Sequence, residues 1–233
     1  MKYRIADTIV EMDAIFKIKS QAIKYLYSTD KPADIKVNIP DIEAYNKRQP
    51  DYTYESFCYM LSGSDFYKKL LDFGGMMLHA SAVAVEDKAY LFSAASGTGK
   101  STHTQLWLEK FGNSAYIIND DKPAIRYVDG ELYVYGTPWS GKTDLNVNSR
   151  AKLQGICFLQ RDERNWIRRQ SAEESIERIM HGSLKRLTVP QLKKQIDIIK
   201  NIIENVPIFT MGCTPTPDAA EMSYNAMKNK QLL

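Results

Sequence analysis

The sequence predicts an α/β protein in which a mixed central sheet carries a loop of the phosphate-binding type. Three observations support this. A short apolar run, residues 89–92, passes directly into a small-residue loop that ends Gly-Thr-Gly-Lys-Ser at 97–101. A helix-compatible stretch follows the loop, and further apolar runs of strand length occur on both sides. The C-terminal part has the spacing of amphipathic helices, so we expect strands covered by helices.

Length and composition indicate one large globular domain with an appendage. The chain has 233 residues, of which 44% are hydrophobic and 25% charged. This length is enough to bury a hydrophobic core. We place a boundary after residue 73. Residues 1–73 mix helix and strand signals without a chemical motif and are expected to form an α+β appendage. Residues 74–233 hold the loop and are expected to form the main domain, with helices at its C-terminal end.

Charge and cysteine content restrict the partners and the compartment. The net charge of +3 is small and no basic run is long, which argues against nucleic acid. No run of about 18 apolar residues occurs, so no membrane span is expected. The three cysteines lack pairing or metal-ligand spacing, and the first residues lack the apolar core of a signal peptide. We therefore expect a cytoplasmic protein. Whether it forms a homo-oligomer is left undecided by the sequence.

Strand and helix signals follow one another along the whole chain. The expected strands are Tyr3–Val10, Asp34–Ile39, Met76–Val85, Lys88–Phe92, Ala115–Asn119, Ala124–Val128, Glu131–Tyr135, Lys152–Leu159 and Ile208–Met211. The expected helices are Tyr52–Leu71, Ser101–Phe111 and three that begin after Ser171, Thr188 and Thr216. Asp129-Gly130 predicts a two-residue hairpin turn, and Arg161–Arg169 is expected to be a solvated turn.

The small-residue loop that precedes the expected helix Ser101–Phe111 has the residue pattern of a phosphate-binding loop. Backbone N–H groups of a small-residue loop and of a helix N-terminus converge on phosphate oxygens. In this pattern a lysine reaches the β- and γ-phosphates and a hydroxyl binds Mg²⁺. Ala94 stands where the pattern has its first glycine. The alternative interpretation is a glycine-rich turn that binds no ligand. The expected nucleotide-binding residues are Ser96, Gly97, Thr98, Gly99, Lys100, Ser101 and Thr102.

Two adjacent carboxylates and one histidine are candidates for the chemistry. Asp120 and Asp121 end the next apolar strand, and strand C-termini border the ligand crevice in nucleotide-binding α/β folds. One would lie near a metal and the other near an attacking hydroxyl, which benefits from a proton acceptor. A strand-ending turn is the alternative. His79 lies on the strand before the loop and is either a core histidine or part of the site.

A long polar loop, Gly136–Arg150, follows the predicted hairpin. Trp139 and Lys142 put an aromatic ring and a cation on a segment that we expect to be anchored at its ends and free in its middle. Such a loop could clamp a phosphate or an acceptor molecule. The alternative is a surface loop held in place by Trp139.

At these residues the chain resembles the kinase domain of the HPr kinase/phosphorylase family, which is related in fold to phosphoenolpyruvate carboxykinases. The resemblance lies in His79, in the run from Ala95 to Ser101 and in the Asp120-Asp121 pair, and it covers about Gly74–Leu159. Residues 1–73 do not match the usual N-terminal domain of that family. Its glutamate-containing glycine-rich loop is not recognisable either.

The resemblance implies ATP and Mg²⁺ as ligands and a fold of the HPr kinase type. It implies Lys100 on the β/γ-phosphates, Ser101 and Asp121 on Mg²⁺, Asp120 as the base and His79 beside the acceptor or the aspartates. The two aspartates are exchangeable in these roles. The implied reaction is transfer of the γ-phosphate of ATP to a hydroxyl, with serine in a peptide or as a small molecule as the expected acceptor. The alternatives are a carboxykinase-like small-molecule phosphotransferase and a non-catalytic nucleotide-binding sensor.

Overall fold

The fold is a mixed α/β architecture, as predicted. The computed structural model describes residues 1–228, so residues 229–233, the end of the predicted main domain, lie outside the described residues. Within the described part a nine-stranded sheet runs in the order β4-β8-β9-β10-β6-β5-β7, and β12 and β11 extend it beside β10. Its strands are β4 (Gly75–Met77), β5 (Ala80–Val85), β6 (Lys88–Ser93), β7 (Ala115–Asn119), β8 (Ala124–Val128), β9 (Glu131–Tyr135), β10 (Arg150–Arg161), β11 (Trp166–Arg169) and β12 (Ile208–Cys213).

Strand direction brings the candidate residues to one edge of this sheet. β6 is parallel to β10, and both β6 and β7 are antiparallel to β5. The C-terminal ends of β6 and β7 therefore lie at the same edge as the N-terminal end of β5. β6 leads into the glycine-rich loop, which we define as residues 94–99, and β7 leads into Asp120 and Asp121.

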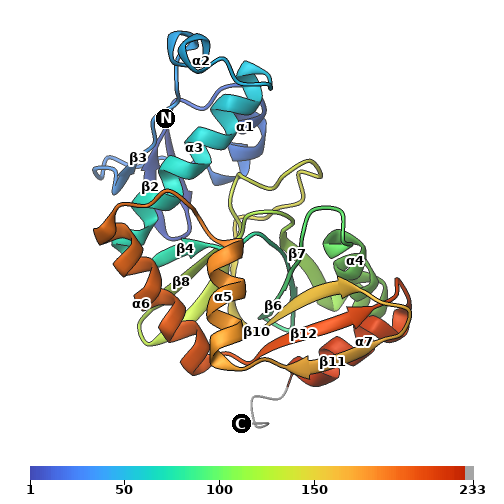
Figure 1. Cartoon of the computed structure of the whole chain (residues 1–233). Coiled ribbons are helices and arrows are strands. Elements are labelled where there is room, and N and C mark those ends of the chain that lie inside the picture. The colour runs from blue at the N-terminus through green and yellow to red at the C-terminus, as the bar shows by residue number, and fades with distance from the viewer. Residues whose placement is uncertain (229–233) are drawn as a thin grey trace.

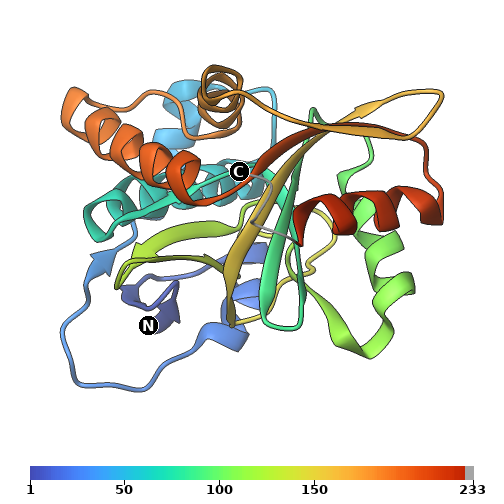
Figure 2. The ribbon, with the colours of Figure 1, turned by 90° about the horizontal axis from the view of Figure 1, so that it is seen from below.

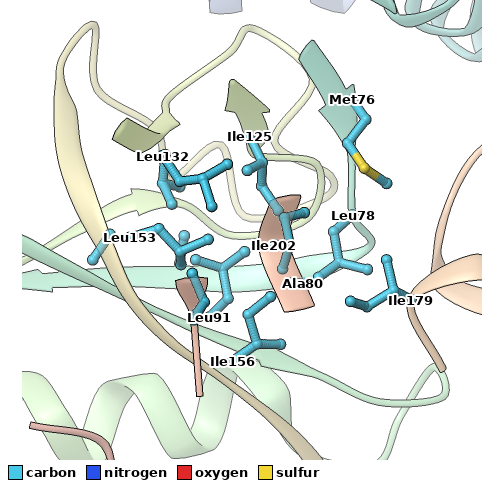
Figure 3. Packing of buried hydrophobic residues seen from close by; sticks show 14 of the residues in the cluster. Met76, Leu78, Ala80, Leu91, Ile125, Leu132, Leu153, Ile156, Ile179 and Ile202 are labelled. Carbon is cyan, nitrogen blue, oxygen red and sulfur yellow. The ribbon is translucent and has the colours of Figure 1, made fainter. Parts of the chain in front are cut away.

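Helices cover both faces of the sheet. The main-domain helices are α4 (Lys100–Phe111), α5 (Ala172–Gly182), α6 (Val189–Asn205) and α7 (Pro217–Met227). Figures 1 and 2 show α5 and α6 on one face, and α4 and α7 on the other. Successive side chains of a strand point to opposite faces of the sheet, so one strand packs against both layers of helices. In β6, Ala89 and Leu91 join the cluster under α5 and α6, part of which is drawn in Figure 3, whereas Tyr90 and Phe92 pack with α4 and α7.

The N-terminal residues form a small α+β unit that packs directly on the main sheet. Its elements are β1 (Lys2–Ile5), β2 (Thr8–Glu11), α1 (Phe16–Ala22), β3 (Ile35–Lys36), α2 (Ile42–Arg48) and α3 (Tyr54–Leu70), with short 3₁₀ turns at Ile23–Tyr25, Leu71–Phe73 and, later in the chain, Gly112–Ser114. One hydrophobic cluster contains Tyr3, Ile5 and Phe66 together with Met77 and Trp139. The two parts of the chain therefore share a core.

Most predicted elements are confirmed, the expected strand Asp34–Ile39 is shortened to the two residues of β3, and three other elements are corrected. The Asp129-Gly130 hairpin and the capping box at Ser171 are present. Tyr3–Val10 is a hairpin of two strands, and Met76–Val85 is likewise interrupted, so that His79 lies between β4 and β5 and not on a strand. The segment expected to be a solvated turn contains β11, which pairs with β12. Among the described residues no helix combines the length and the apolar character needed to cross a bilayer.

Candidate functional site

The glycine-rich loop has the backbone geometry of an open cradle. Gly97 and Gly99 have φ values of +77° and +119°, which L residues rarely adopt, and in the described residues nothing beyond their immediate chain neighbours lies within 4 Å of where a Cβ would stand. Gly99 is the N-cap of α4 and supplies no capping side chain, and the first turn of α4 contains no acidic residue. The N–H groups at this helix start are thus left available to an anionic ligand.

Lys100 directly follows this loop as the first residue of α4, and its buried side chain reaches back to the loop entry. Its ammonium group donates hydrogen bonds to the carbonyl oxygens of Ala94 (3.0 Å) and Ala95 (3.4 Å). Burial lowers the pKa of Lys100, and the nearby carboxylates of Asp121 and Asp120 partly offset this effect. The ammonium therefore contacts the loop backbone and lies near enough to the two carboxylates to feel their charge.

Asp120 is a buried carboxylate with a hydroxyl donor on each oxygen. Ser81 donates to Oδ1 (2.6 Å) and Thr143 donates to Oδ2 (2.9 Å). Thr104 of α4 is hydrogen-bonded to Ser81 in turn (2.9 Å), and its hydroxyl oxygen lies 3.2 Å from the carbonyl oxygen of Ser101. Asp120 is thus connected to the first turn of α4, where the Ser101 hydroxyl lies.

Asp121 contacts basic side chains instead. His79 Nε2 lies 3.1 Å from its Oδ1, and the Lys122 ammonium contacts its Oδ2. Burial raises the pKa of the Asp121 carboxyl, but the hydrogen bond from His79 and the Lys122 charge outweigh burial and leave the pKa below its usual value. Asn119 Oδ1 accepts the backbone N–H groups of Asp121 (3.0 Å) and Lys122 (2.7 Å), which fixes this turn.

Two adjoining cavities surround the loop. The first, of about 490 Å³, is lined by Lys100, Ser101, both aspartates and His79, together with Ser96, Gly97, Gly99, Thr102, Gly141, Lys142 and Thr143. The second, of about 440 Å³, borders Gly97, Thr98, Gly99 and Thr102 and extends to Leu106, Arg161, Cys213 and Pro215. All the predicted loop residues therefore line one or both of these spaces.

Trp139 does not face either cavity, which corrects its expected role. It is fully buried, stacks on Phe66 at 4.8 Å between ring centroids, and donates from Nε1 to Ser62 Oγ (3.2 Å). The alternative, in which Trp139 holds the loop in place, fits the structure. Lys142 is exposed and lines the 490 Å³ cavity.

The loop Gly136–Arg150 is also less free than expected. Its residues 145–147 run beside the end of β7, with Asp120 N–H donating to Leu145 (3.0 Å) and Val147 N–H to Ile118 (3.1 Å). The N-terminal unit holds its middle: Gly141 N–H donates to Tyr59 Oη (2.8 Å), and Lys17 Nζ donates to the Gly141 carbonyl (2.5 Å). Figure 1 shows this loop rising from the sheet toward α1 and α3.

His103, which follows Ser101 by two residues, is buried and is one of the residues lining the 440 Å³ cavity. Its Nε2 lies 3.0 Å from Ser223 Oγ of α7, and burial lowers its pKa to about 4. The ring is therefore neutral at neutral pH and joins α4 to α7.

Sequence reasoning did not identify several residues that position the site. Ser81, Thr143, Asn119 and Tyr59 each hold a carboxylate, its turn or the covering loop. Their contacts join segments far apart in the chain, so residue type and spacing alone give no signal for them.

The donor set suits Mg²⁺ bound together with a nucleotide. No group of three or more His, Cys, Asp or Glu side chains that could hold a metal occurs among residues 1–228. Mg²⁺ usually takes one or two carboxylates and completes its shell with phosphate oxygens and water. Ser101 and a carboxylate of the aspartate pair, in one cavity beside the loop, meet that requirement.

Comparison with known proteins assigns no family. No protein-family model matches the chain, and no curated protein matches it. A solved structure of the Hpr(Ser) kinase/phosphatase from Coxiella burnetii aligns with a TM-score of 0.39 and 14% sequence identity, over 64% of this chain and 95% of that chain. This likeness is too weak to assign a family or an activity.

Proposed function

We propose that the protein is an ATP-dependent, Mg²⁺-requiring kinase that transfers the γ-phosphate to a hydroxyl acceptor. The observation that carries this proposal is the convergence of Lys100, Ser101, Asp120, Asp121 and His79 on one cavity at the start of α4. A cation, a metal-binding hydroxyl, two carboxylates and open backbone N–H groups are the parts that phosphoryl transfer requires.

The linings of the two cavities support one orientation of the proposed nucleotide. The 440 Å³ cavity has apolar and polar lining beyond Thr98 and Thr102 and suits the base and ribose. The phosphates then follow the loop backbone into the 490 Å³ cavity, where Lys100 faces the β- and γ-phosphates. The γ-phosphate end is thereby directed toward His79 and Asp121.

The contacts of the two aspartates support distinct roles. Asp120 is linked through Ser81 and Thr104 to the turn of Ser101, so we assign Asp120 and Ser101 to Mg²⁺, which would neutralise charge on the phosphates when bound. Asp121 lies beside His79, so we assign Asp121 as the proton acceptor. These roles are the reverse of those first assigned from the resemblance, in which the two aspartates were exchangeable.

The chemical step follows from these positions. The acceptor oxygen forms a bond to the γ-phosphorus as the bond from that phosphorus to the β,γ-bridging oxygen breaks, and ADP leaves with the electron pair. The hydroxyl proton passes to the Asp121 carboxylate. The low pKa of Asp121 is compatible with this role, because a loose transition state demands little proton transfer. His79 orients the carboxylate by its hydrogen bond.

Incubation with γ-labelled ATP, Mg²⁺ and serine acceptors tests the proposal. Serine, free or in a peptide, is the acceptor that the motif resemblance favours. We expect label on an acceptor hydroxyl, detected by mass spectrometry, and transfer that is slower by at least about 10²-fold in Lys100→Ala. Nucleotide binding without transfer to any hydroxyl acceptor would instead identify a nucleotide sensor, and transfer confined to an enol or carboxylate oxygen would identify a carboxykinase-like phosphotransferase.

A further inference from the structure

A third cavity, of about 670 Å³, adjoins the candidate site. It lies between the entry of the glycine-rich loop, the β4–β5 connection and the C-terminal end of α5, and it shares His79 and Ser96 with the 490 Å³ cavity. None of its lining residues is acidic, whereas four can carry positive charge: His79, Lys122, Arg178 and His181. The cavity therefore begins where the γ-phosphate end of the proposed nucleotide would stop, and it favours negative charge.

The four basic side chains fall into two pairs. His79 and Lys122 contact Asp121, so their positive charge is already opposed by a carboxylate. Arg178 and His181 are one turn apart on α5 and so share a face of that helix. Within residues 1–228 neither Arg178 nor His181 forms an ion pair closer than 4 Å, although the charge of Arg178 acts on Glu174 one turn earlier and helps to lower the pKa of that carboxyl. The Arg178 guanidinium lies 5.9 Å from the centroid of the Phe158 ring, which supports its position at the cavity.

The end of α5 does not cancel this positive character. A helix C-terminus carries partial negative charge on its free carbonyl groups. Here several of those carbonyls already accept donors. Ile179 accepts from Ser183 Oγ (2.6 Å), Met180 from Lys185 Nζ (2.9 Å), and Gly182 from the His79 N–H (2.8 Å).

We propose that this cavity is the acceptor site and that it recognises the acceptor by an anionic group, a carboxylate or a phosphate monoester, bound by Arg178 and His181. This inference rests on the proposed kinase function and specifies its substrate class. The acceptor hydroxyl would extend past His79 to meet the γ-phosphate beside Asp121. Phe158 and Met77 supply apolar lining for the carbon skeleton between the two ends.

Matched acceptor pairs test the proposal. N-acetyl-L-serine and N-acetyl-L-serinamide differ by a carboxylate, and glycerol 3-phosphate and glycerol differ by a phosphate. Transfer from γ-labelled ATP is measured for each pair with the full-length wild type, with Arg178→Gln, with His181→Gln and with Lys193→Gln. Lys193 is exposed on α6 and does not line the cavity, so it controls for the loss of one positive charge. Saturation-transfer NMR measures binding of the same compounds independently of catalysis.

We expect the anionic member of one pair to be favoured about 10- to 100-fold in kcat/KM, the usual effect of a charge-assisted contact. Arg178→Gln should remove most of that preference, mainly through KM, and Lys193→Gln should retain it. The favoured pair distinguishes a carboxylate from a phosphate.

Equal use of both members in both pairs, or an unchanged preference in Arg178→Gln and His181→Gln, would overturn the acceptor site. If nothing is phosphorylated, the binding measurement decides. NMR signals for an anionic probe that are lost in Arg178→Gln would support the cavity while refuting the kinase. The absence of such signals would refute the cavity.

Discussion

Lys100 is the residue on which phosphoryl transfer should depend most. Its ammonium lies against the loop carbonyls and beside both carboxylates, and no core packing requires it. We expect Lys100→Ala to weaken ATP binding and to slow transfer by at least about 10²- to 10³-fold, the usual effect of removing one preorganised electrostatic contact. Calorimetry with ATP and a transfer assay measure the two effects. Wild-type turnover in a folded Lys100→Ala protein would refute the nucleotide site.

The Asp120→Asn and Asp121→Asn variants should differ in how their transfer rates depend on Mg²⁺ concentration. Asp121→Asn should slow transfer by roughly 10²- to 10⁴-fold at saturating Mg²⁺ with ATP affinity retained, because the proton acceptor is lost. Asp120→Asn should raise the Mg²⁺ concentration needed for half-maximal rate, because a metal ligand is lost. Rate against Mg²⁺ concentration distinguishes them, and the reverse pattern would restore the assignment that follows chain order.

His103 should make stability depend on pH. Its pKa is about 4 in the folded protein and about 6.5 when unfolded, so the unfolded chain binds the proton more readily. The contribution of the neutral ring is therefore complete above pH 6.5 and is lost as pH falls toward 4, by up to about 3 kcal/mol. Urea unfolding at pH 7.5 and 4.5 should show a smaller loss in His103→Gln than in the wild type. The exposed His181→Gln variant should behave as the wild type does; equal losses in all three proteins would contradict this prediction.

At the scale of elements, the loop Gly136–Arg150 is held by contacts with α1 and α3. Tyr59 accepts the Gly141 N–H, and Tyr59→Phe leaves that group without its partner. Loss of one hydrogen bond costs about 1 kcal/mol, which should speed proteolysis of the exposed residues 142–145 about fivefold if cleavage follows local opening. Tyr127→Phe, on β8, is the control. Equal cleavage rates in both variants would show that Tyr59 does not restrain the loop.

Trp139 belongs to the core and should act on stability. Trp139→Ala removes a stacked, fully buried ring and should lower the free energy of unfolding by about 3–5 kcal/mol. Urea unfolding followed by circular dichroism measures this change. A loss below about 1 kcal/mol together with a raised acceptor KM would instead restore the substrate-clamp role.

The elements that local sequence could predict are those with local causes. Asp129-Gly130 forms its turn from its own backbone preferences, and Ser171 and Glu174 satisfy each other at the start of α5. β11 forms only because β12, more than forty residues later, offers a pairing edge. The loop motif and the aspartate pair are local sequence patterns whose proposed roles stay predictions. The burial of Trp139 depends on Phe66 and Ser62 of α3, which no spacing reveals.

At the scale of the whole molecule, the N-terminal unit and the main sheet are expected to fold together. The shared cluster joins Tyr3 and Phe66 to Met77 and Trp139, and Arg126 donates to the carbonyl of Phe73 (2.8 Å). A fragment of residues 74–233 should therefore lack cooperative urea unfolding and a near-ultraviolet circular dichroism signal. A fragment with native-like stability would instead establish residues 1–73 as an independent appendage.

A crystal structure with Mg²⁺ and a non-hydrolysable ATP analogue tests the central claim most directly. We expect the base in the cavity beside Thr98 and Leu106, the triphosphate along residues 96–101, and the γ-phosphate between Lys100 and the His79–Asp121 pair. The metal should contact Ser101. A nucleotide bound elsewhere, or a γ-phosphate directed away from His79 and Asp121 into solvent, would contradict the proposed kinase site.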